Sequence, residues 1–322
     1  MIINKKVLVT GGAGFIGSNL VDQLLKNNNI VICLDNLSTG HKRNIKDNLA
    51  NPNFKFIKGD IRDLETCVLA SKDVDFILHQ AALGSVPRSI KNPVASSEVN
   101  VLGFVNILWS AVTNKVKRVV YAASSSTYGD NIELPKVEDN TGDPLSPYAV
   151  TKLVNELYAK IFAKTYNIET VGLRYFNVFG PKQDPNGDYA AVIPKFINLI
   201  KEGHSPIVNG DGLHSRDFTY IDNVVQANQL AATTTNLESL NKVYNIACGR
   251  GTNLNQLIEV IKSEIKEKGI NTTMIKTIYG PERVGDIRHS LASIDRAKML
   301  LGYNPTITFD EGIKLTIKSF FN

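Results

Sequence analysis

Tyr148 and Lys152 are the residues whose types and spacing first suggest proton chemistry. They lie four residues apart in the segment SPYAVTKLVNE, where Ser146 can cap a helix and Pro147 suits its first turn. A helix places both side chains on one face. Free tyrosine has a pKa of about 10, so ionising it at neutral pH costs about 4 kcal/mol. A lysine ammonium ~4 Å away, at an effective dielectric constant of ~20, contributes about 4 kcal/mol, which is large enough to make Tyr148 a usable base.

A run of serines precedes this pair. Ser124, Ser125 and Ser126 end the apolar segment VKRVVYAAS, which predicts a strand over 116–124. Serines after a strand are also typical of a plain turn. Because the carboxyl end of a strand is where open α/β sheets bind ligands, a serine hydroxyl there could instead hold a substrate oxygen. Ser124, Tyr148 and Lys152 are therefore the candidate catalytic residues.

The segment VLVTGGAGFIGSN predicts a nucleotide site. Gly11, Gly14 and Gly17 fall between an apolar strand and a helical pattern, where they allow a tight turn and a pyrophosphate at the helix N-terminus. Asp35 ends the next strand, 18 residues after Gly17. A carboxylate there can accept the adenosine ribose hydroxyls and repel a 2′-phosphate, so we expect NAD rather than NADP, with Arg43 the one nearby residue that argues against this.

Asp60 closes the third expected strand, in IKGDI. Two roles fit this position equally well. Its carboxylate could accept a hydrogen bond from the adenine amino group, or it could cap the following helix.

These residues need a scaffold of alternating strands and helices. Apolar runs predict strands over 5–10, 29–35, 54–60, 74–80, 116–124 and 168–176, with helical patterns between them that include 15–28 and 93–114. Such alternation predicts an α/β protein with a Rossmann-type, doubly wound parallel sheet. We expect an NAD-binding domain over 1–176, to which 217–249 returns, and a smaller α/β substrate domain over 177–322.

Composition narrows the class further. The chain has 322 residues and a formal net charge of +5, but its basic residues are dispersed, which argues against a nucleic-acid surface. No apolar run is long enough to span a membrane, no signal-peptide pattern opens the chain, and the three cysteines lack metal-ligand spacing. We therefore expect a cytoplasmic protein without a metal site.

Longer strings carry a resemblance to a known family. QAALGSVPRSI (80–90), AASSSTYGD (122–130), LRYFNVFGPKQDPNGDYAAVIPKF (173–196), RDFTYIDNV (216–224) and RVGDIRHS (283–290) resemble the extended short-chain dehydrogenase/reductases. The resemblance covers the whole chain. It is narrower still to sugar-nucleotide 4-epimerases, and especially to UDP-N-acetylglucosamine 4-epimerases.

The resemblance implies residue roles, position by position. Tyr148 would be the base, Lys152 its partner, and Ser124 the group that holds the sugar C4 oxygen. Matching substrate positions are Gly84, Ser85, Ser125, Ser126, Asn177, Val192, Lys195, Asn209, Arg216, Arg283, Asp286 and Ser290. Matching cofactor positions are Gly11, Gly14, Phe15, Ile16, Gly17, Asp35, Asn36, Ser38, Thr39, Gly40, Asp60, Ile61, Gln80, Ala81, Ala82, Asn100, Tyr148, Lys152, Tyr175 and Val178.

The implied activity is NAD-dependent C4 epimerisation of a UDP-sugar through a transient 4-keto sugar. Small Ser290 favours the UDP-GlcNAc/UDP-GalNAc pair, with UDP-Glc/UDP-Gal poorer. Alternatives are a UDP-glucuronate or N-acetylhexosaminuronate 4-epimerase, in which Arg88 or Lys195 would face the carboxylate. A 4,6-dehydratase would carry an Asp-Glu pair where this chain has Ser125–Ser126. A non-catalytic NAD sensor would lose Tyr148 or Lys152.

The resemblance also implies a homodimer formed through helices that include 94–113 and 146–165. Leu102, Leu108 and Trp109 suit such an interface, and core packing explains them equally well.

Overall fold

The computed structural model describes residues 1–186, 191–282 and 288–321. Seven strands form one sheet in the order β11-β6-β5-β4-β1-β2-β3. They are β1 (Lys6–Thr10), β2 (Ile30–Asp35), β3 (Phe54–Lys58), β4 (Phe76–His79), β5 (Arg118–Ser124), β6 (Glu169–Tyr175) and β11 (Lys242–Ile246). All neighbouring pairs in this sheet are parallel. The predicted doubly wound parallel sheet is confirmed.

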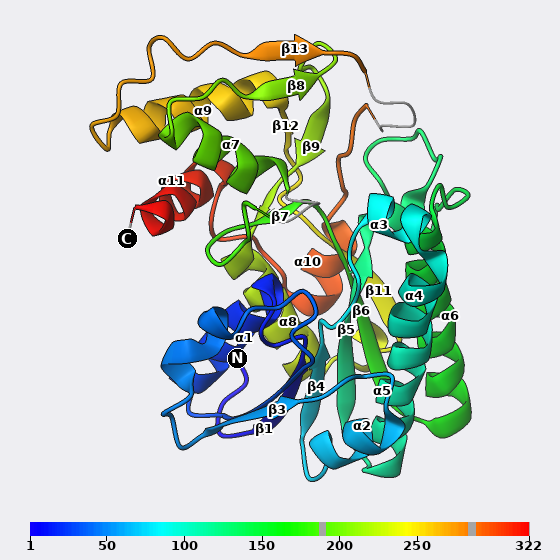
Figure 1. Ribbon diagram of the computed structural model, residues 1–322. Coiled ribbons are helices and arrows are strands. Elements are labelled where there is room, and N and C mark those ends of the chain that lie inside the picture. Colours follow the sequence, from blue (N-terminus) through cyan, green and yellow to red (C-terminus); the bar gives the residue numbers. More distant parts are fainter. Residues whose placement is uncertain (187–190, 283–287, 322) are drawn as a thin grey trace.

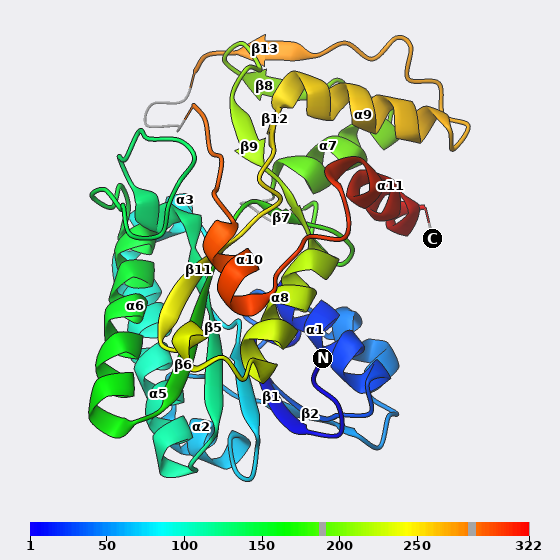
Figure 2. The same cartoon turned by 180° about the vertical axis from the view of Figure 1, so that it is seen from behind.

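Helices cover both faces of the sheet, which explains why its central strands are continuously apolar. One face carries α2 (Leu64–Ala70), α5 (Gly103–Thr113) and α6 (Pro147–Tyr166), and the other carries α1 (Phe15–Lys26), α8 (Ile221–Thr233) and α10 (Asp295–Leu301), as Figures 1 and 2 show from opposite sides. Val7, Leu8 and Val9 of β1 are fully buried between these layers.

The first turn of α6 forms for the reason that its sequence suggests. The Ser146 hydroxyl accepts the backbone N–H of Ala149 at 3.2 Å, and Pro147 stands in the first turn. The helical pattern over 93–114 is interrupted, however. It divides into α4 (Pro93–Ser97), a π-helical turn (Glu98–Leu102) and α5.

A second layer of structure lies beyond the carboxyl ends of the strands, at the top of Figure 1. It contains α7 (Val192–Lys201), α9 (Leu254–Lys266) and α11 (Phe309–Phe320), with the paired strands β8 (Ile207–Asn209) and β13 (Ile278–Gly280), and β9 (Ser215–Asp217) and β12 (Gly251–Asn253). A third short pair, β7 (Val178–Phe179) and β10 (Thr219–Tyr220), joins it to the sheet. The short helix α3 (Val86–Lys91) stands after β4, and short 3-10 helices span Lys42–Asn48, Ser125–Tyr128 and Leu237–Ser239.

Within the described ranges, none of the helices is long and apolar enough to cross a membrane. The same residues contain no cluster of His, Cys, Asp or Glu side chains suited to a metal ion.

Candidate active site

The sheet order brings the predicted residues to one edge. The glycine turn follows β1, Asp35 ends β2, and Gln80–Ala82 follow β4. The serines end β5, and Asn177 follows β6, which is the next strand. Ser124 ends β5, which lies between β4 and β6. The residues after β4 line one cavity, and Asn177 after β6 lines another.

The first cavity has a volume of about 560 Å³ and lies over the glycine turn. Its lining includes Gly11, Gly14, Phe15, Ile16, Gly17, Asp35, Asn36, Ser38, Thr39, Asp60, Ile61, Gln80, Ala81, Ala82 and Gly84. All of these are residues that the sequence proposes for cofactor or substrate.

The glycine turn has no room for side chains. A Cβ on Gly17 would stand 2.2 Å from the carbonyl oxygen of Gly11. Gly11 has φ +66°, and a Cβ there would stand 2.7 Å from the backbone nitrogen of Ala81. No side chain caps the N-terminus of α1, so its first N–H groups face the cavity as an anion site. This arrangement fits the pyrophosphate of a dinucleotide.

Asp35 organises the loop above this turn. Its carboxylate accepts the backbone N–H of Ala13 at 2.9 Å and that of Leu37 at 2.8 Å, while the residue still lines the cavity. Arg43, the residue that argued for NADP, pairs with Asp184 at 3.6 Å. The carboxylate of Asp35 in the cavity and the pairing of Arg43 both favour NAD over a 2′-phosphate.

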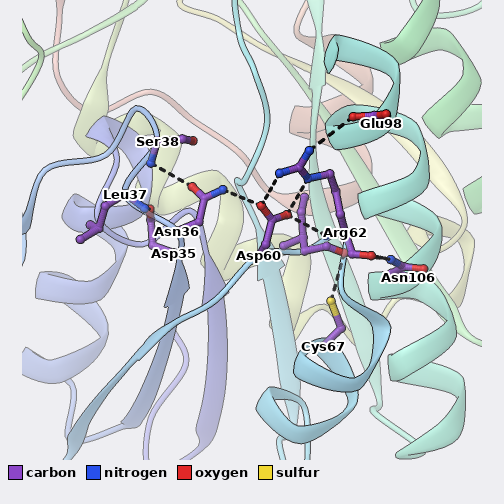
Figure 3. A network of polar contacts seen from close by, with 10 residues as sticks. Asp35, Asn36, Leu37, Ser38, Asp60, Arg62, Cys67, Glu98 and Asn106 are labelled. Carbon is purple, nitrogen blue, oxygen red and sulfur yellow. Dashed lines mark hydrogen bonds and ion pairs between the residues drawn. The ribbon is translucent and has the colours of Figure 1, made fainter. Parts of the chain in front are cut away.

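Asp60 lies at the centre of a polar network, shown in Figure 3. Its carboxylate pairs with Arg62 at 2.9 Å and accepts a hydrogen bond from Asn36 at 2.9 Å, and the bond from Arg62 is the main reason that the pKa of Asp60 falls to about 2. The alternative role as a helix cap is wrong, because Asp63 caps α2 by accepting the N–H of Glu65. Asp60 is thus an ionised acceptor that lines the cavity.

The second cavity, of about 260 Å³, lies in the upper layer. Asn177, Val192, Lys195, Asn209 and Arg216 line it, all of them residues that the sequence proposes for the substrate. Phe196, Ile207, Val208, Phe218 and Leu254 add apolar walls. The combination suits a flat ring joined to an anionic group.

The candidate catalytic residues meet at the edge of the sheet. The Ser124 hydroxyl oxygen accepts the Ser126 N–H at 3.1 Å and the Ser126 O–H at 2.9 Å, so its own proton remains available for another acceptor. Tyr148, in the first turn of α6, is held by its N–H donating to the Ser89 hydroxyl at 3.0 Å. Burial raises the pKa of Tyr148, and a hydrogen bond with Ser124 opposes that rise.

Comparison with known proteins identifies the family. The family model described as "NAD dependent epimerase/dehydratase family" matches residues 7–247. The chain belongs to this family. NAD is its cofactor.

Three relatives cover nearly the whole of this NAD-dependent epimerase/dehydratase family member. A putative UDP-glucose 4-epimerase of Methanocaldococcus jannaschii is 42% identical over 97% of each chain. The UDP-N-acetylglucosamine 4-epimerase of Methanobrevibacter ruminantium, solved with UDP-N-acetylmuramic acid, is 40% identical and superimposes with a TM-score of 0.92 over 99% of each chain. The UDP-glucose 4-epimerase of Thermotoga maritima, solved with UDP-glucose, is 36% identical with a TM-score of 0.90 over 98% of each chain.

In this family member, the structure gives Lys152 a backbone partner that the sequence did not indicate. Its ammonium donates to the Ala122 carbonyl at 2.7 Å and lies 5.9 Å from the centre of the Tyr148 ring. Burial lowers the pKa of Lys152 to about 8, and the charge of Glu156 raises it again in part. Burial raises the pKa of Tyr148 and Ser124 opposes that rise, and the lowering of this pKa by Lys152 stays a prediction.

Glu156 is one of the residues that sequence reasoning missed. It lies one turn after Lys152 on α6 and forms a bidentate pair with the buried Arg174, at 2.8 and 2.7 Å. The i, i+4 spacing from Lys152 was visible in the sequence. Its partner on β6, Arg174, could not be predicted from the sequence.

Six predicted cofactor residues lie outside the lining of the first cavity, among them Tyr148 and Lys152. Asn100 is 1% exposed and bonds the backbone of Leu83 in both directions, so it positions the wall and does not face a ribose. The Tyr175 hydroxyl bonds Gln80 and Asn228 behind that wall. Gly40 packs against Asp35, and Val178 belongs to β7.

The remaining substrate predictions divide in the same way. Ser85 caps α3 by accepting the N–H of Arg88, and it lines neither cavity. Ser290 also lines neither, although its N–H donates to the carbonyl of Ser215, next to Arg216. Arg283 and Asp286 lie outside the described residues.

A loop after β7, which includes Lys182 and Asp184, closes one side of the first cavity, and the sequence did not predict this. Asp184, from the loop after β7, pairs with His41 at 2.9 Å, and both residues line the cavity. Nearby, Lys182 pairs with Asp22 of α1 and donates to the Asn44 carbonyl at 2.8 Å. These partners are more than a hundred positions apart, so no local pattern announces them.

Proposed function

We propose that this protein is a UDP-sugar 4-epimerase that interconverts UDP-GlcNAc and UDP-GalNAc, with UDP-Glc and UDP-Gal as poorer substrates. The observation that carries this is the sheet order, in which β5 ends at Ser124 between β4, whose following residues line the dinucleotide cavity, and β6, after which Asn177 lines the second cavity with Arg216 and Lys195. Relatives solved with UDP-sugars support it.

In the proposed reaction the Tyr148 phenolate accepts the C4 hydroxyl proton and returns it after the sugar has turned over. Ser124 accepts from Ser126, so when substrate binds its proton can turn from the Tyr148 oxygen to the C4 oxygen and hold it in both directions. Bound NAD supplies the hydride acceptor and donor. Arg216 and Lys195 hold the diphosphate, so the sugar can rotate without leaving. Because the hydride returns to the sugar in each cycle, turnover should need no added NAD.

The neighbours of Ser124 argue against dehydration. Ser125 and Ser126 stand where a 4,6-dehydratase would need its Asp-Glu pair, and neither can act as an acid or base at C5 and C6. A uronate substrate is the other alternative. Arg88 lines the first cavity and Lys195 lines the second, and either could face the carboxylate. Incubation with UDP-GlcNAc, UDP-Glc and UDP-GlcA in parallel, without added NAD and with products followed by NMR, separates the candidates. Conversion of UDP-GlcA alone would contradict the proposal.

The N-acetyl preference rests on Ser290, whose backbone is held beside Arg216 through Ser215. A small residue there leaves space next to the sugar C2 position, and a tyrosine would fill it at a cost of roughly 1–3 kcal/mol. Ser290→Tyr should lower kcat/KM for UDP-GlcNAc by about 10-fold and spare UDP-Glc. Equal losses on both substrates would show that Ser290 does not select at C2.

We also propose a homodimer through α5 and α6. Leu102, which ends the π-helical turn before α5, is 49% exposed, and Trp109 of α5 is 41% exposed. Leu157 and Ile161 of α6 are 56% and 55% exposed, so apolar side chains lie on the outer side of both segments. Leu108 does not belong to this surface, because it is fully buried in the core. Sedimentation of wild type and Ile161→Glu tests the proposal, and a monomeric wild type would contradict it.

A further inference from the structure

We infer that His214 is a binding residue for the nucleoside end of the substrate, and this inference rests on the proposed function. His214 lines the second cavity and is 7% exposed. It stands immediately before β9, two residues before Arg216. Side chains alternate along an extended chain, so both residues face the same side, and both line the cavity.

The imidazole of His214 lacks the partner that a buried ring nitrogen needs. Its Nδ1 is buried and makes no hydrogen bond within the described parts of the chain. Buried polar atoms in native proteins are nearly always paired, and leaving one unpaired weakens the fold unless a ligand completes it.

The other four histidines show the contrast. His41 bonds Asp184, His79 bonds the Thr10 hydroxyl, and His289 bonds the Ser215 hydroxyl. His204 is mostly exposed and lies 3.6 Å from Glu202. Within the described residues, His214 is thus the histidine that is buried, lines the second cavity and has a ring nitrogen without a hydrogen-bond partner.

The position of His214 within the cavity indicates which end of the ligand it meets. Arg216 and Lys195 provide the positive charge for a diphosphate, and Phe196, Phe218 and Val208 provide apolar walls for a base. Two residues along an extended strand span about 6–7 Å, so His214 reaches a different group of the ligand from the one that Arg216 binds. A ribose hydroxyl or a base carbonyl is the hydrogen-bonding group expected there.

The ring has fixed surroundings. Gly210 has φ +75°, and a side chain on it would begin 3.4 Å from His214 Cε1, so the glycine allows the ring to pack closely. Asp211 interacts with His214 through its charge but is itself paired with Arg288 at 3.0 Å. Within the described residues, the His214 ring is therefore closely packed while its Nδ1 makes no hydrogen bond.

The test uses the full chain with its NAD and three probes: UDP, uridine and inorganic pyrophosphate. His214→Phe removes both ring nitrogens and keeps a flat ring, and it should weaken UDP and uridine binding by about 10-fold while leaving pyrophosphate unchanged. His214→Gln restores one hydrogen-bonding group and should recover part of the loss. His204→Phe is the matched control and should bind like wild type. In turnover, His214→Phe should raise KM and leave kcat within about two-fold.

Unchanged UDP affinity in a folded His214→Phe would overturn the inference, as would a loss confined to UDP and pyrophosphate. If that variant does not fold, the wild-type protein decides the matter: uridine should shift the His214 ring resonances, assigned with His214→Gln, and unshifted resonances would overturn the inference. A wild type that binds UDP through His214 but epimerises no UDP-hexose would contradict the proposed function and leave this inference standing.

Discussion

The two cavities are built in different ways. The first is shaped mainly by backbone: a glycine turn without room for side chains, an uncapped helix end, and the ends of adjacent strands. The second is shaped by side chains from α7, β8, β9, the start of α9 and the loops beside them, all within 177–254. The difference teaches that the first cavity depends on a turn that has no room for side chains, whereas the second depends on the side chains themselves.

The largest effect should come from the edge between the cavities. Tyr148→Phe removes the proposed base and keeps the ring, so turnover should fall by about 10² or more. NAD content and UDP affinity should both survive, since neither cavity loses a wall. Measurements of kcat, bound NAD and UDP titration check this, and loss of NAD from the variant would show that Tyr148 holds the cofactor instead.

NAD binding in the first cavity should be weakened by a substitution that displaces the glycine turn. Gly17→Ala places a Cβ 2.2 Å from the Gly11 carbonyl oxygen, so the turn must shift. Overpacking of this kind costs roughly 1–3 kcal/mol, and NAD affinity should fall by about 10-fold or more.

Gly84→Ala is the matched control, because Gly84 lines the same cavity and nothing lies within 4 Å of its added Cβ. NAD released on denaturation gives the comparison. Equal retention in both variants would show that the turn tolerates a side chain.

UDP binding in the second cavity should be weakened by a substitution of one side chain. Arg216→Lys keeps the charge but loses the planar fork that pairs two phosphate oxygens, so UDP should bind about 10-fold more weakly. Bound NAD should stay at the wild-type level. Arg288→Lys serves as control, because Arg288 is exposed and pairs with Asp211. A matching loss in the control would point to general charge and not to the fork.

The smallest effect concerns Lys152, which lies near the candidate catalytic residues at the edge of the sheet. Lys152 has a pKa of about 8, depressed by burial, and the charge of Glu156 raises it. Glu156→Gln removes that charge, so Lys152 should lose its proton at a lower pH. If activity requires the lysine charged, the alkaline limb of the pH–rate profile should move to lower pH.

Glu169→Gln is the control for this change. It breaks a similar pair with the buried Arg118 at 2.7 Å, at the opposite end of β5 and β6. Both variants should lower the melting temperature, since a buried arginine loses its partner in each. An alkaline limb that moves in both, or in neither, would remove Glu156 from the site.

Prediction from sequence reached furthest where structure is local. The strands β1, β2 and β5 and the start of α6 follow from apolar runs, glycines and the Ser146 cap, whose interactions lie within a few residues. The sequence left the role open where one residue could serve two purposes. Asp60 suited a helix cap as well as an adenine contact, and Leu108 suited the core as well as an interface, because burial is not a property of the residue itself.

The sequence by itself determined the parallel sheet, the glycine turn after β1 and the serine run that ends β5, because periodicity and turn chemistry are written in neighbouring residues. Only the tertiary structure decided that Lys152 bonds Ala122, that Glu156 meets Arg174, and that His214 shares a cavity with Arg216 and Asn177. The physical reason is distance along the chain: pairing energies and burial depend on which segments the sheet order brings together, and no local pattern contains that order.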